Sequence, residues 1–130
     1  MQTGCTVDIQ MGDPSATYLD IRTNAKLGKL YQSHAKAMGV KYTSGSEQWI
    51  AGSTDMGNVS YVKPSIHPMY SIDTEAVNHS HGFTAAAGTK TAHEKTLIAA
   101  KAMAFTAIEV LCKPEMMKEI KADFDTIIGH

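Results

Sequence analysis

The segment 89–112 constrains the fold most strongly, because apolar residues recur in it at the spacing of a helix. Its residues at i, i+3, i+7, i+11 and i+14 are Leu97, Ala100, Ala104, Ile108 and Leu111. Five alanines lie between Ala99 and Ala107, which would let the predicted helix pack closely against a sheet. Lys101, Thr106 and Glu109 interrupt the apolar run, so this segment is not expected to span a membrane. A helix of this kind needs another layer of structure to pack on.

Two more amphipathic helices are predicted, one before and one after this segment. The first begins after Asn24, a good capping residue, and ends at Gly39. Its apolar stripe consists of Leu27, Tyr31, His34 and Met38. The last helix has Pro114 in its first turn and ends at Gly129. Its stripe consists of Met117, Ile120, Phe124 and Ile127. A short helix is also expected to start near residues 53–55.

The predicted strands are few. Residues 5–10 alternate apolar and polar side chains, which is the pattern of a half-buried strand. Residues 66–72 form a second expected strand, interrupted by Pro68, and residues 40–42 a short third. Strands that alternate with helices indicate the α/β class with a mostly parallel sheet. Two or three strands are too few to cover two long helices, so part of the expected sheet is missing from this chain.

The composition excludes some classes of function. The chain has 130 residues, and its 12 Lys and Arg against 13 Asp and Glu give a net charge of -1. This balance gives no basic surface for nucleic acid or for an anionic membrane. Cys5 and Cys112 are too few for a disulfide framework, and the first ten residues do not resemble a secretory signal. We therefore expect reduced thiols and a cytoplasmic protein.

The segment 52–58 is the first candidate for chemistry. Gly52, Ser53 and Thr54 precede the short predicted helix, where backbone N–H groups and hydroxyls can meet an anion such as a carboxylate. The alternative is a plain turn and helix cap, in which Asp55 satisfies backbone donors.

Histidines are the second candidates. His79 and His81 lie two residues apart in an expected loop, and neutral imidazole is a common zinc ligand. A zinc site takes three or four protein ligands, and the nearby chain offers only Asp73 and Glu75. A polar surface loop is the alternative. For His67, beside an expected strand, we predict a structural, hydrogen-bonded role.

Two other residues are predicted to be structural. His34 lies on the apolar stripe of its helix and is expected at the boundary of the core. Cys112 ends an apolar helix and is expected to be a small buried hydrophobic residue rather than a nucleophile.

Four separated motifs occur in the same order in a known family. They are Gly52-Ser53-Thr54-Asp55-Met56-Gly57-Asn58-Val59-Ser60, Pro64-Ser65-Ile66-His67-Pro68, Asn78-His79-Ser80, and the alanine-rich helix. Together they resemble the C-terminal part of the M-twenty zinc metallopeptidases, the family of aminoacylase, the glutamate carboxypeptidases and the auxin-conjugate amidohydrolases. Residues 3–7 also resemble the last strand of that family's lid, so the resemblance covers essentially the whole chain.

The resemblance implies a two-domain subunit. Residues 1–17 would be the end of an inserted α+β lid, or dimerisation domain, and residues 18–130 the C-terminal part of an α/β catalytic domain. The missing strands would then belong to sequence upstream of this chain. Full-length relatives of this kind are expected to form homodimers.

The resemblance also implies roles for particular residues. His79 matches the family's last metal ligand in a site for two zinc ions. Gly52, Ser53 and Thr54 match a substrate-binding loop, which Asp55 would brace. His81 has no ligand counterpart, and the general base and remaining ligands would lie upstream, so no catalytic residue is expected in this chain.

Two functions follow as hypotheses. The chain is expected to be the C-terminal fragment of a zinc-dependent amidohydrolase or dipeptidase. The full enzyme would cleave small dipeptides of the β-alanyl-lysine type or N-acyl amino acids, and the fragment would be inactive alone. The alternative is a non-catalytic interaction or dimerisation module of the same fold, whose unpaired sheet edge favours association.

Overall fold

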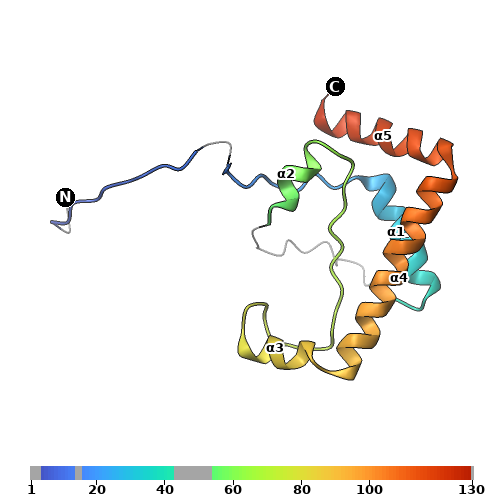
Figure 1. The fold of residues 1–130 in the computed structure, drawn as a ribbon, viewed down its shortest axis with the longest axis horizontal. Coiled ribbons are helices and arrows are strands. Elements are labelled where there is room, and N and C mark those ends of the chain that lie inside the picture. The colour runs from blue at the N-terminus through green and yellow to red at the C-terminus, as the bar shows by residue number, and fades with distance from the viewer. Residues whose placement is uncertain (1–3, 14–15, 43–53, 130) are drawn as a thin grey trace.

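The computed structural model describes residues 4–13, 16–42 and 54–129, and within these ranges it is helical (Figure 1). The helices in chain order are α1 (Ala25–Ala37), α2 (Met56–Ser60), α3 (His81–Ala87), α4 (Lys90–Cys112) and α5 (Pro114–Ile128). Helices α1, α4 and α5 contact one another, whereas the short α2 makes no helix–helix contact among these five.

The three long helices agree with the sequence because their ends carry strong local signals. The side chains of Asn24 and Thr89 accept backbone N–H groups in the first turns of α1 and α4. Pro114 opens α5, where its missing N–H costs nothing. Gly39 and Gly129 follow α1 and α5 with φ of 87° and 84°, a left-handed backbone that glycine adopts readily.

Helix α3 was not expected, since residues 79–88 have no helical apolar period. The side chain of Ser80 accepts the backbone N–H of Phe83 at 3.2 Å and so caps the helix. Residues 85–87 are all alanine, the best helix former. These two local signals were available in the sequence, and the prediction of a loop at His81 is wrong.

The expected sheet is hardly present in the part of the chain that the structure describes. Residues 5–10, 40–42 and 66–72 have no strand ladder there, and only an isolated parallel bridge joins Thr23 and Ser65. Val7 is 80% exposed and Ile9 is 70% exposed, although their alternation fits a strand. A strand forms only where a neighbouring strand pairs with its backbone groups, and the described residues provide no such strand for these segments. The α/β class therefore remains an expectation.

The small core lies between α1 and α4. Tyr31, Ala35 and Ala102 are buried together, and Met38, Val40 and Ile66 pack against them. At the edge of this core, Nε2 of His34 lies 2.9 Å from a carboxylate oxygen of Glu109, which agrees with the boundary position predicted for His34.

Asn24 forms hydrogen bonds to three separate parts of the fold. Its side chain accepts the N–H of Leu27 at 2.9 Å and donates to the carbonyl of Ile120 in α5, also at 2.9 Å. Its backbone N–H donates to the carbonyl of Ser65 at 2.9 Å. Asn24 is fully buried, so these bonds replace those that its amide would make with water.

Helix α4 packs on the core with its face of small residues, and not with the face that bears its large apolar residues. Ala92, Ala99, Ala102 and Thr106 are its buried residues. On the opposite side Leu97, Ile108 and Leu111 are 44%, 55% and 78% exposed. Cys112 is also exposed, so its predicted burial is wrong. Large apolar side chains are usually buried, and the side of α4 that bears Leu97, Ile108 and Leu111 has no partner in the described residues. No helix in these ranges is long and apolar enough to cross a membrane.

Candidate functional site

The substrate loop predicted from the sequence leads into α2. Gly52 and Ser53 lie outside the described residues, whereas Thr54 and Asp55 directly precede the helix. Oγ1 of the half-buried Thr54 accepts the N–H of Met56 at 3.3 Å. Asp55 is exposed, and its side chain makes no capping bond to α2. The alternative in which Asp55 caps the helix is therefore wrong for its side chain, while the bracing of residues 52–54 by Asp55 stays a prediction.

Helix α2 is held by residues 16–23, which we call the crossing segment. The amide of Asn58 donates to the carbonyl of Thr17 at 2.9 Å and accepts the N–H of Leu19 at 3.3 Å. The hydroxyl of Ser60 accepts the N–H of Arg22 at 2.9 Å. Gly57 is buried against the same segment, since a Cβ there would overlap the carbonyl of Leu19.

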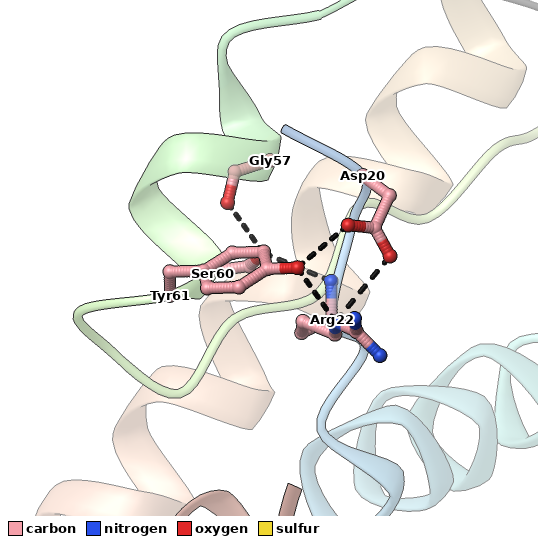
Figure 2. A network of polar contacts seen from close by, with 5 residues as sticks. All are labelled: Asp20, Arg22, Gly57, Ser60 and Tyr61. Atoms are coloured by element: carbon pink, nitrogen blue, oxygen red, sulfur yellow. Dashed lines mark hydrogen bonds and ion pairs between the residues drawn. The ribbon is translucent and has the colours of Figure 1, made fainter. Parts of the chain in front are cut away.

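A polar cluster extends this contact to the surface (Figure 2). The hydroxyl of Tyr61 donates to Oδ1 of Asp20 at 2.6 Å and accepts Nε–H of Arg22 at 3.0 Å. Nε of Arg22 also lies 3.3 Å from Oδ2 of Asp20, and the guanidinium lies 5.3 Å from the centre of the Tyr61 ring. The bond from Tyr61, helped by the charge of Arg22, holds the pKa of Asp20 below its ordinary value. The carboxylate is therefore ionised at neutral pH.

Sequence reasoning did not find this cluster. Tyr61 lies 41 residues from Asp20 and 39 from Arg22, and no spacing rule links residues at that separation. Only the packing of α2 on the crossing segment shows that these side chains meet.

The predicted metal ligand lies at the start of α3. His79 is exposed and has a φ of 64°, in the left-handed region. Histidine visits this region more often than most residues, but it remains uncommon outside glycine. Ser80, the next residue, ties this turn together by donating to the carbonyl of Val77 at 2.7 Å.

Ranges 4–13, 16–42 and 54–129 contain no group of three or more His, Cys, Asp or Glu that could hold a metal ion. His79 offers an accessible imidazole, and His81 is exposed in the first turn of α3. A zinc site needs three or four protein ligands, so His79 fits a zinc site only as one member of a larger set.

The structure does not bring the two predicted sites together. Helices α2 and α3 do not contact each other and lie at opposite ends of the extended segment 61–80 (Figure 1). His67 lies within that segment and is exposed, so its structural role stays a prediction.

A cavity of about 460 Å³ lies elsewhere, between α1, α4 and residues 69–71. Its lining includes Tyr31, Tyr42, Tyr70, Lys41 and Lys95. Burial raises the pKa of the Tyr31 and Tyr42 phenols. Among the described residues, none of those predicted to bind substrate or metal lines this cavity.

Comparison with known proteins shows two relatives of this chain. It is 40% identical over 126 residues to a human protein named Xaa-Arg dipeptidase, and 39% identical over 126 residues to the mouse protein of that name. Each match covers 95% of this chain. The chain is a relative of the M-twenty peptidases. It spans 28% of the human and 29% of the mouse relative. No family model matches, and no solved structure does either.

The M-twenty relationship confirms the resemblance drawn from the four motifs. The roles of His79 and of residues 52–54 stay predictions. M-twenty peptidases are generally metal-dependent, which makes the histidine at the turn before α3 the residue of greatest interest.

Proposed function

We propose that this chain supplies part of a zinc-dependent dipeptidase and is inactive alone. The observation that carries the proposal is its 40% identity to a named dipeptidase over 95% of its length. We propose dipeptides with a basic C-terminal residue as substrates. The human and mouse relatives are named Xaa-Arg dipeptidase, and the motif resemblance points to β-alanyl-lysine. N-acyl amino acids are the second substrate class.

His79 would be the residue of this chain that binds zinc. Its imidazole is exposed, and the turn that presents it is fixed by Ser80. Two bound zinc ions would polarise the scissile carbonyl and lower the pKa of a bound water. Residues 52–54 would orient the substrate with backbone N–H groups and the hydroxyls of Ser53 and Thr54. The general base is proposed to lie upstream of this chain.

The exposed face of α4 supports the view that the chain works within a larger protein. Leu97, Ile108 and Leu111 lie on the side of α4 that faces away from the core. At about 25 cal/mol per Å² of apolar surface, covering this face would stabilise the fold considerably. The exposure of Val7 and Ile9, at 80% and 70%, is consistent with the same view. We propose a cytoplasmic homodimer as the complete enzyme.

The proposal is tested with the full-length protein that contains this chain. We expect it to hydrolyse β-alanyl-lysine and dipeptides that end in arginine, to lose activity with a chelator and to regain it with zinc. A chimera in which this chain replaces the matched 126 residues of the human relative provides a second test. If the full-length protein hydrolyses none of these substrates when loaded with zinc, and the chimera folds without activity, the proposal is wrong.

The exposed face of α4 also favours the second candidate function, a non-catalytic interaction module. Size-exclusion chromatography with zinc analysis distinguishes the two. A full-length protein that self-associates through this chain but neither binds zinc nor cleaves dipeptides would favour the module.

A further inference from the structure

We propose that the cavity between α1, α4 and residues 69–71 is a binding site for a small apolar carboxylate. Its volume of about 460 Å³ lies within the range of about 300–1,000 Å³ that is usual for small-molecule sites. This site does not depend on the proposed dipeptidase function, because none of the described residues predicted to bind substrate or metal lines the cavity.

A buried hydroxyl without a partner is the first observation. Tyr31 lines the cavity and is 6% exposed, and its hydroxyl makes no hydrogen bond to another described residue. That hydroxyl is not among the described side-chain atoms that are sealed from solvent without a hydrogen bond, so it is reached from the cavity. Burial, together with the nearby phenols of Tyr42 and Tyr70, raises the pKa of Tyr31. The phenol therefore keeps its proton at neutral pH and is a donor that still needs an acceptor.

The surroundings of this hydroxyl favour an organic ligand over water. Met38, Val40, Ile98 and Ala99 contribute apolar surface to the same lining. An ordered water needs about two to four polar partners and gains nothing from apolar surface. A molecule that has one polar end and an apolar body would satisfy the hydroxyl of Tyr31 and cover these side chains as well.

The walls of the cavity are held in place by the protein itself. On one side the hydroxyl of Tyr70 lies 3.1 Å from Oγ1 of Thr96 in α4. On the other side the backbone N–H of Val40 donates to the carbonyl of Ala35 in α1 at 3.0 Å. A ligand would therefore enter a cavity that is already formed, which lowers the cost of ordering the protein around it.

Charge favours an anion as the polar end of the ligand. Lys41 and Lys95 line the cavity, whereas none of its described lining residues is Asp or Glu. Asp73 offsets the charge of Lys95, since its Oδ1 lies 2.6 Å from Nζ, but Lys41 makes no ion pair with a described residue. A carboxylate accepts hydrogen bonds from both phenol and ammonium groups, so it matches this lining better than an uncharged group.

The test is a titration of the full-length protein with 3-phenylpropanoate. The protein is labelled with ¹³C at its methionine methyl groups, and the NMR signals of Met38 and Met69, which both line the cavity, report binding at this site alone. Each signal is assigned by replacing that methionine with leucine. The uncharged 3-phenylpropanamide is the control ligand, because it has the same ring and chain.

Two variants remove the groups on which the proposal depends. Tyr31→Phe removes the hydroxyl, and Lys41→Gln removes the charge. The matched controls are Tyr18→Phe and Lys29→Gln, because both residues are exposed and neither lines the cavity. Lys41 is exposed, so its variant tests the site even where a change at the buried Tyr31 disturbs folding.

We expect 3-phenylpropanoate to move the signals of both methionines and to bind about tenfold more tightly than the amide. We expect each of the two variants to weaken its binding about tenfold, as the loss of one hydrogen bond to an ion allows, while the two controls match the wild type. Signals that do not move, equal binding of acid and amide, or unchanged affinity in both variants would overturn the proposal. None of these outcomes bears on dipeptide hydrolysis, so a failure here is distinct from a failure of the proposed function.

Discussion

Replacing His79 with alanine in the full-length protein is expected to remove one of the two zinc ions and to lower kcat/KM at least about 100-fold. Outer-shell partners of metal ligands typically contribute about 10–100-fold to metal affinity or activity, so a ligand itself should contribute more. The imidazole of His79 is exposed and makes no hydrogen bond to another described residue, so alanine is not expected to unfold the chain.

The matched control is His81→Ala. His81 lies two residues away, is also exposed and has no predicted ligand role. Zinc content by elemental analysis and hydrolysis of a dipeptide ending in arginine should be normal in this control. If His79→Ala keeps full activity and both zinc ions, His79 is not a metal ligand.

Replacing Gly57 with alanine should destabilise the contact between α2 and the crossing segment by about 3 kcal/mol, which is the upper end of the usual cost of overpacking. The added Cβ would overlap the carbonyl of Leu19, and a backbone carbonyl cannot move aside as a flexible side chain can. Because that contact supports α2, we expect Thr54 to lose its position and the KM for a dipeptide ending in arginine to rise.

Hydrogen exchange of residues 16–23 and 56–61 measures this local opening directly. The control is Gly28→Ala in α1, where a Cβ would meet only Cγ2 of Ile66 at an ordinary 3.9 Å. That change should be neutral or stabilising by up to about 1 kcal/mol, because alanine is the better helix former. Equal exchange rates in Gly57→Ala and the wild type would show that the crossing segment does not hold α2.

The long helices could be predicted almost to the residue because their ends depend on local chemistry. Asn24, Thr89 and Pro114 begin α1, α4 and α5, and the left-handed Gly129 ends α5. The stripe of α5 is also confirmed, since Ile120 is buried and Met117, Phe124 and Ile127 are half-buried.

Which side of α4 packs could not be predicted from periodicity. Large residues mark one face, but α1 packs on the face of small ones, where Ala99 and Ala102 allow close approach. The large residues, Leu97 among them, have no neighbours to bury them in the described chain. Residues 5–10 likewise have the alternating pattern of a strand, but they form no strand ladder with the described residues.

The residues of the candidate site also fall into two groups, those that the sequence could indicate and those that only the structure brings together. Thr54 and His79 were singled out by residue type and family resemblance, which need no tertiary contact. The cluster of Asp20, Arg22 and Tyr61 depends on side chains about 40 residues apart, and nothing in the sequence alone links them.

The most direct test of the account is the zinc content of the 130-residue chain compared with that of the full-length protein, both measured after dialysis against trace zinc. We expect two zinc ions in the full-length protein and no stoichiometric zinc in the isolated chain, because one histidine ligand cannot hold the ion tightly. An isolated chain that keeps stoichiometric zinc and cleaves dipeptides would contradict the central claim that its metal site is completed by residues outside it.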